Sequence, residues 1–239
     1  MGDVSIALPG IELLSKLGHE LRGPINGVSG LARVMLMKLA AGPVDPAQQI
    51  RQLEMIRASA GQLLETVERI VDVARLDVTP RSEATAQADC TAQADCTAIV
   101  DDVLAALAPF AAARGVRLLA ETPDRPLPVA GAPDLLQRLV RELVDNAVKY
   151  TDSTQVRVSA AESGDGTRID VTDDGPGIAA DEQERIFAPF VRGEAADERA
   201  VPGSGLGLYL AQRIAERAGA QIGLQSTPGL GSRFTVWVS

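Results

Sequence analysis

The sequence predicts an α+β protein in which an antiparallel helical hairpin precedes an α/β sandwich domain. Apolar residues recur every three or four positions in the first 79 residues, whereas from residue 97 onward helix-like segments alternate with short β-like runs. Between them, residues 80–96 are small and polar and contain a tandem hexapeptide, which is typical of a linker. We therefore expect three parts, at residues 1–79, 80–96 and 97–239.

The first part contains two amphipathic helical patterns. One apolar seam runs from Leu14 to Leu39 and a second runs from Ile50 to Ala74. Gly42, Pro43 and Pro46 separate them, because proline lacks the amide donor and clashes with the preceding turn. The two helices are expected to pack antiparallel, and one hairpin leaves a long apolar stripe uncovered. We therefore expect a homodimer in which two hairpins form a four-helix bundle.

The last part alternates two kinds of pattern. Helix-like segments occupy 98–114, 133–150 and 206–218, and β-like runs occupy 116–120, 155–160, 168–172, 221–226 and 233–238. Pro228 and Gly229 separate the final two runs, which predicts a terminal hairpin. This alternation predicts a layer of helices on a sheet.

Charge and composition narrow the function classes. The formal net charge is -9 and no basic stripe is visible, so nucleic-acid binding is not expected. No run approaches the roughly 20 apolar residues that span a bilayer, and the N-terminus lacks a secretory pattern. We expect no membrane contact within this chain and a cytoplasmic location.

The two cysteines occupy equivalent positions in the repeated hexapeptide. Cys90 and Cys96 could form a disulfide or a thiol switch, but the stronger interpretation is a short duplication in a linker that carries two copies of its cysteine, both reduced. A metal site would need further ligands nearby, and the sequence has none there.

His19 is the only histidine, and it lies two positions from both Leu17 and Leu21. On a helix this spacing points its side chain away from the apolar seam, toward water. A solvated surface histidine has the same pattern. Glu20, beside it, can orient the imidazole tautomer and accept a proton when the other nitrogen acts as a nucleophile.

The segment Gly18–Ile25 resembles the phosphoacceptor box of two-component histidine kinases. The resemblance implies that His19 accepts a phosphoryl group, and Pro24 should bend the helix just past it. Gly23 departs from the pattern, because related kinases usually carry a polar side chain there that is implicated in removing phosphate from the partner regulator. We therefore expect weak phosphatase activity toward the regulator.

The segment Arg141–Thr151 resembles the asparagine box of the same kinases and of the wider GHKL (Bergerat-fold) ATPases, which include gyrase B and Hsp90. The resemblance implies that Asn146 holds Mg²⁺ through its carbonyl oxygen, that Lys149 contacts phosphate and that Tyr150 flanks the nucleotide. Glu142 stands where the family has its first asparagine. It can act as a base, support Mg²⁺, or be an allowed variant of the family.

Two glycine-rich segments resemble the family's glycine boxes. In the first, Asp173 matches the aspartate that accepts a hydrogen bond from the adenine amino group, and Gly175 and Gly177 follow it. The second opens a helical pattern, where backbone amides can approach phosphate, and its matching residues are Gly203, Gly205, Leu206 and Gly207.

Between the glycine boxes, Arg185–Phe190 resembles the family's phenylalanine box. Arg192 matches an arginine that the family places on the transferred phosphate. The polar stretch 194–202 would form a lid over ATP.

Together these boxes resemble a HisKA-type phosphoacceptor domain joined to a GHKL ATPase domain. The resemblance implies ATP-dependent autophosphorylation of His19 with Mg²⁺, and transfer to an aspartate on a response-regulator receiver domain. The alternative is a pseudokinase that acts as a dimerising regulator of another kinase. Such a chain usually loses an acceptor or an ATP residue, whereas this one retains His19, Asn146 and Asp173.

Overall fold

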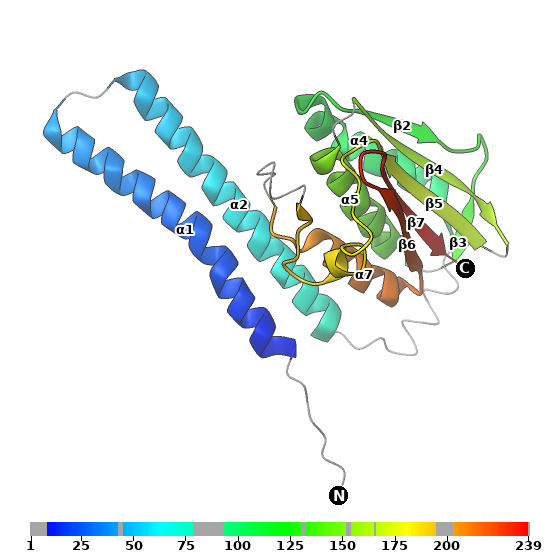
Figure 1. Ribbon diagram of the computed structural model, residues 1–239. Helices are drawn as coiled ribbons and strands as arrows, with labels where there is room; N and C mark the ends of the chain where they lie inside the picture. The colour runs from blue at the N-terminus through cyan, green and yellow to red at the C-terminus, as the bar shows by residue number, and fades with distance from the viewer. Residues whose placement is uncertain are drawn as a thin grey trace, which may run out of the picture. The chain divides into compact units, whose positions relative to one another are not determined.

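The computed structural model describes residues 9–42, 45–78, 93–130, 132–151, 154–164, 166–194 and 203–238 (Figure 1). The chain divides into two compact units, with the main break between Val71 and Asp72. A helical N-terminal region precedes a domain with a mixed sheet, so the α+β fold class predicted from the sequence is confirmed.

The first unit is built from two long helices, α1 (Pro9–Ala41) and α2 (Pro46–Val78), and the residues of α2 from Asp72 onward belong to the second unit. A Cβ atom on Gly27 would lie 3.3 Å from Ser59 Oγ, so these two residues pack against each other. Both lie nearly equally far from the turn that joins the helices, and the hairpin is therefore antiparallel (Figure 1).

Two prolines occupy different positions in the helices of this hairpin. Pro46 is the first residue of α2, a position that suits proline, and Asp45 caps the helix because its Oδ1 accepts a hydrogen bond from Ala47 N at 3.0 Å. Pro24, in contrast, lies inside α1, which continues through it as a helix. The bend expected after His19 stays a prediction.

The second unit packs three helices on one face of a five-stranded sheet (Figure 1). The sheet order is β2-β4-β5-β7-β6; β2 and β4 are parallel, and the other pairs are antiparallel. A separate pair joins β1 to β3. The elements are α4 (Cys96–Ala113), α5 (Pro133–Tyr150), α7 (Gly207–Ala218), the 3-10 helix η1 (Arg185–Phe187), β1 (Gln93–Asp95), β2 (Arg117–Glu121), β3 (Pro128–Ala130), β4 (Gln155–Ser163), β5 (Gly166–Asp173), β6 (Gln221–Thr227) and β7 (Gly231–Val238).

The core lies between these helices and the sheet. Helix α5 packs against both α4 and α7, and it contributes the fully buried Leu139 and Leu143. Ile169 on β5 and Val236 on β7 face them from the sheet and are equally inaccessible to solvent. Burial of side chains of this size is the main favourable term in folding.

Among the described helices, α4 alone is long and apolar enough to cross a membrane by length and composition. Its buried residues belong to the core of the second unit: Cys96, Ile99, Val100, Val103, Leu104, Leu107 and Ala111. Packing in a protein core accounts for this apolar composition.

The elements predicted from the sequence are present, with ends that differ by a few residues, and the terminal hairpin β6–β7 is confirmed. The short elements β1, β3 and η1 were not predicted. Folded structure also begins at Gln93, so the last four residues of the expected linker belong to β1 and α4. Residues 79–92, including Cys90, lie outside the described residues.

Cys96 explains why the end of the expected linker is part of the folded domain. Its side chain is fully buried, and burial, followed by the nearby Asp95 carboxylate, raises the pKa of its thiol to about 12. The thiol therefore stays protonated at neutral pH and acts as a small core residue, which argues against a thiol switch.

Asp95 anchors the same segment. Its Oδ1 accepts hydrogen bonds from Thr97 N at the start of α4 and from Leu127 N, each at 3.0 Å. Asp95→Ala would leave both amides without this partner. We expect a loss of about 2 kcal/mol in the free energy of unfolding, measured in urea. Asp101→Ala, on the exposed face of α4, is the matched control, and equal stability of the two variants would contradict this role.

Candidate functional site

Helix α5 presents a row of polar residues at its C-terminal end. Asn146 is buried, and Glu142 precedes it by one helical turn on the same face. Lys149 Nζ forms an ion pair with Asp145 Oδ2 at 2.8 Å, and both side chains are largely shielded from solvent. Asp145 was not predicted as a site residue, although the spacing of four residues on a helix is the sequence signal for such a pair.

The amide of Asn146 is incompletely satisfied by the protein. Its Nδ2 is buried and makes no hydrogen bond with the part of the chain that the structure describes. A buried polar atom left in this state costs free energy that a bound polar ligand would recover. Asn146 therefore fits a residue that holds a ligand and not a residue that serves packing alone.

Asp173 ends β5 beside this helix. Its side chain is buried, and Oδ1 accepts a hydrogen bond from Gly175 N at 2.8 Å. A Cβ atom on Gly175 would lie 2.8 Å from the carbonyl oxygen of Tyr150, the last residue of α5. The fold thus brings Asp173, Gly175 and Tyr150 together, as the sequence predicts for the walls of one site.

Gly205 and Phe190 form a second contact. Both adopt left-handed backbone conformations, with φ of 67° and 61°, and Phe190 N donates a hydrogen bond to the Gly205 carbonyl at 3.0 Å. A Cβ atom on Gly205 would lie 2.8 Å from the Phe190 carbonyl carbon. Only glycine fits this position, and it connects the two predicted boxes.

Helix α7 begins directly after this contact. Gly207 is its first residue, and the preceding Leu206 is buried and supplies no side-chain cap. The N-cap residue therefore supplies no side-chain acceptor for the first turn of the helix, and such a helix start favours an anion. Gly203 lies four residues before Gly207 and is partly exposed.

The remaining predicted residues belong to the loop after η1, the predicted lid and helix α1. Arg192 lies in the loop after η1 and is partly exposed. Most of the predicted lid, 195–202, lies outside the described residues. His19 and Glu20 belong to α1 in the first unit, and their side chains are likewise outside the described part.

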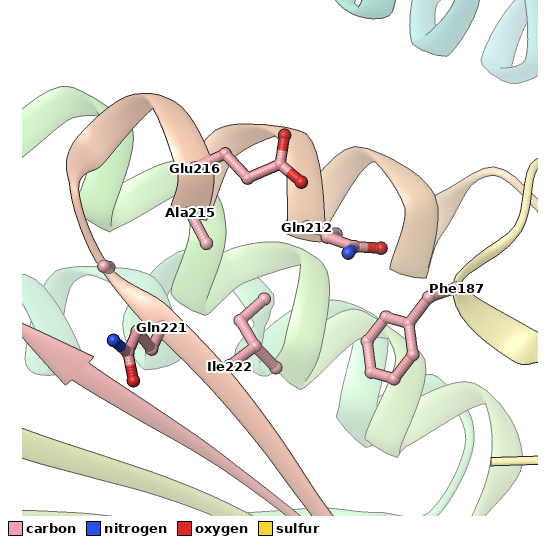
Figure 2. Close-up of a pocket in the computed structure, with 7 residues that line it drawn as sticks. Phe187, Gln212, Ala215, Glu216, Gln221 and Ile222 are labelled. Atoms are coloured by element: carbon pink, nitrogen blue, oxygen red, sulfur yellow. The ribbon is translucent and has the colours of Figure 1, made fainter. Parts of the chain in front are cut away.

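A pocket of about 360 Å³ lies elsewhere on the second unit (Figure 2). It is lined by Phe187, Gln212, Ala215, Glu216, Ala220, Gln221 and Ile222, and therefore lies beside the C-terminal half of α7, away from Gly207 at the opposite end. Phe187 also contacts the ring of Phe234 edge to face, with centroids 6.4 Å apart. None of the predicted site residues lines this pocket.

Comparison with known proteins identifies both units. Residues 131–239 match the family described as histidine kinase-, DNA gyrase B-, and HSP90-like ATPase, and residues 11–79 match the His Kinase A (phospho-acceptor) domain. The chain therefore belongs to the two-component sensor histidine kinase family, with a phosphoacceptor domain followed by a GHKL ATPase domain.

Individual relatives agree with this family. The sensor protein GacS of Pseudomonas syringae pv. syringae is 32% identical over 95% of this chain and 24% of its own length. Full-length ShkA, solved in complex with AMPPNP, is 27% identical with a TM-score of 0.65, over 95% of this chain and 45% of that one. Histidine kinase ThkA, solved with the response regulator TrrA, is 18% identical with a TM-score of 0.72, over 95% and 60%, and this likeness concerns the fold alone.

The chain spans about a quarter of the length of the curated relatives it matches first.

The position of Asp173 predicts the effect of a single-atom change. Asp173→Asn keeps an oxygen that can accept a hydrogen bond from Gly175 N. Its new amide donor, however, would face the adenine amino group, the donor that the family resemblance assigns to the other carboxylate oxygen. We expect AMPPNP to bind at least about tenfold more weakly by calorimetry. Asp174→Asn removes the same charge from the exposed neighbouring residue and should bind like wild type. Equal binding by both variants would place the nucleotide elsewhere.

Proposed function

We propose that this chain is the catalytic core of an ATP-dependent protein histidine kinase that phosphorylates His19 and passes the phosphoryl group to an aspartate of a response-regulator receiver domain. One observation carries the proposal: the only histidine lies on α1, within the match to a phosphoacceptor domain, and the same chain carries the ATPase unit. Donor site and acceptor are thus encoded together.

The nucleotide is proposed to lie between α5, the loop after Asp173 and the start of α7. Asp173 accepts a hydrogen bond from the adenine amino group, and guanine is rejected because it presents an acceptor there. The backbone amides at Gly205 and Gly207 receive the phosphates at this uncapped helix start. Tyr150 flanks the nucleotide from the end of α5.

The buried Nδ2 of Asn146 makes no hydrogen bond among the described residues and, as a donor, would suit a phosphate oxygen. The amide oxygen of the same residue is the proposed ligand for Mg²⁺. Bound there, Mg²⁺ would neutralise charge on the phosphates. Lys149, which is held by Asp145, and Arg192 stabilise the transferring phosphoryl group with their positive charges.

In the reaction, a His19 ring nitrogen forms a bond to the γ-phosphorus as the bond to the ADP oxygen breaks. Glu20 accepts a hydrogen bond from the N–H of the other ring nitrogen, which keeps the attacking nitrogen unprotonated, and it takes up that proton as the N–P bond forms. The resulting phosphohistidine then donates its phosphoryl group to the aspartate of the regulator. ThkA, which shares this fold, was solved with a response regulator as its partner, and a partner of that class is proposed for this chain.

The first unit is proposed to dimerise. Several members of its apolar seam remain exposed in the single hairpin, namely Ile25, Leu39, Ile50, Leu53 and Val67, each at least 40% accessible. In the described part of the second unit, only Leu230 and Trp237 are large apolar residues with comparable exposure. An exposed apolar stripe of this length fits a second hairpin, which gives a four-helix bundle. We assign the kinase core to the cytoplasm, where ATP and regulator are available.

The acceptor is tested with γ-labelled ATP and Mg²⁺. Wild type should acquire label that is labile in acid and stable in base, and His19→Gln should acquire none while it still binds AMPPNP. Asn26→Ala, on the exposed surface of the same helix, is the control and should be labelled normally. Label that persists in His19→Gln would contradict the assignment.

The same assay separates the alternatives left by the sequence. A pseudokinase would leave wild type unlabelled. If Glu142 activates water, as in hydrolytic relatives of the family, His19→Gln would release inorganic phosphate, and Glu142→Gln in that background would stop the release.

The dimer is tested by multi-angle light scattering at micromolar concentration. We expect the full chain to be a dimer, and Leu39→Glu with Leu53→Glu to give a monomer, because buried charges without partners are costly. Leu230→Glu introduces the same charge at an exposed leucine of the second unit and should leave the dimer intact. A monomeric wild type would exclude the bundle.

A further inference from the structure

We propose that Gln183 and Ser226 are positioning residues that hold the first glycine loop, residues 174–178, in the shape that the nucleotide site requires. The inference rests on the proposed role of Asp173 in adenine binding. It assigns a task to two side chains outside the glycine, asparagine and phenylalanine boxes. Neither residue belongs to a recognised motif, and both are proposed to act through the loop.

Ser226 lies on β6 and reaches the end of the loop. Its Oγ accepts a hydrogen bond from Ile178 N at 2.8 Å. The same hydroxyl lies 2.9 Å from the Gly231 carbonyl and 3.0 Å from Ser232 Oγ, so its proton has an acceptor on β7. The hydroxyl therefore connects the loop to both strands of the terminal hairpin.

Gln183 completes this arrangement from the other side of Ile178. Its Nε2 donates to the Ile178 carbonyl and to the Ser226 carbonyl, each at 3.1 Å. Both backbone polar groups of Ile178 are thus held by side chains, the N–H by Ser226 and the carbonyl by Gln183. A residue held at both groups cannot rotate without losing two hydrogen bonds.

Backbone contacts leave the loop little freedom on the same side. Gly229 N donates to the Pro176 carbonyl at 2.7 Å. Gly177 has a φ of 69°, and a Cβ atom on it would collide with the Thr227 carbonyl oxygen. The loop therefore lies directly on the β6–β7 turn, with no room for a side chain between them.

The opposite end of the loop carries the chemistry. Gly175 N donates to Asp173 Oδ1 at 2.8 Å and fixes the carboxylate that is proposed to meet adenine. Only Pro176 and Gly177 separate Gly175 from Ile178. Release of Ile178 would let this short loop shift and weaken the hold on Asp173. Gln183 and Ser226 thereby influence nucleotide affinity without contact with the nucleotide.

The test uses Ser226→Ala, which removes the hydroxyl, and Gln183→Glu, which replaces the donor with a carboxylate beside two carbonyl oxygens. In the full chain, each should weaken AMPPNP binding about tenfold, the effect expected from loss of one or two hydrogen bonds. KM for ATP should rise in parallel, with kcat of autophosphorylation unchanged. Exchange of the Ile178 amide hydrogen should accelerate in Ser226→Ala.

Two controls separate positioning from general damage. Ser226→Thr retains the hydroxyl and should restore wild-type affinity and exchange. Gln225→Glu makes the same charge change as Gln183→Glu, but on the exposed neighbour of Ser226, and should bind AMPPNP like wild type. The double variant should bind no more weakly than the product of two single effects, because both act on Ile178.

The outcomes distinguish this inference from the proposed function. Wild type that fails to bind AMPPNP would overturn the nucleotide site and the inference together. Wild-type binding with unchanged affinity in both Ser226→Ala and Gln183→Glu would overturn the positioning role alone. A lower kcat with unchanged KM would also overturn it, since the loop would then serve the chemical step. If Ser226→Ala does not fold, Gln183→Glu at the partly exposed Gln183 decides the question.

Discussion

The second unit depends on α5, a single helix that both packs in the hydrophobic core and carries residues of the candidate site. Its fully buried Leu139 and Leu143 pack between the neighbouring helices and the sheet. One turn later the same helix buries Asn146, a polar residue whose amide nitrogen has no partner among the described residues. The free energy from apolar burial holds this polar group in place, and a bound ligand would recover its cost. Stability and binding are therefore coupled through one element.

The first glycine loop, residues 174–178, shows a second form of this coupling. Asp173 ends a central strand, so its backbone position is set by pairing with Val156 on one side and Ser232 on the other. The loop that follows is fixed by hydrogen bonds to a hairpin about fifty residues further along the chain. Rigid strands thus position the carboxylate, and the terminal hairpin shapes the loop around it. Preorganisation of this kind reduces the entropy lost on binding.

Sequence patterns could predict elements that bury a face over several turns or strand positions. Helix α5 was predicted with its observed ends, because its apolar residues repeat regularly. Strands β1 and β3 have three residues each and carry too little periodicity to detect. The site residues came from local motifs, whereas Gln183 and Ser226 are 43 residues apart and leave no local signal for their contact. Asp95 caps α4 locally through Thr97, but its second hydrogen bond comes from Leu127, 32 residues away, and that contact leaves no local signal.

Gly23 is a glycine inside α1 that packing within the hairpin does not explain. It lies on the exposed surface of α1, where a Cβ atom would meet nothing within 4 Å among the described neighbours. Packing within the hairpin therefore does not require glycine, although glycine costs about 1 kcal/mol relative to alanine inside a helix. With Pro24 next to it, the helix just past His19 lacks both a side chain and one backbone hydrogen bond. The local cost is consistent with a functional reason for glycine, either a freer acceptor helix or the absence of the polar group that would activate water.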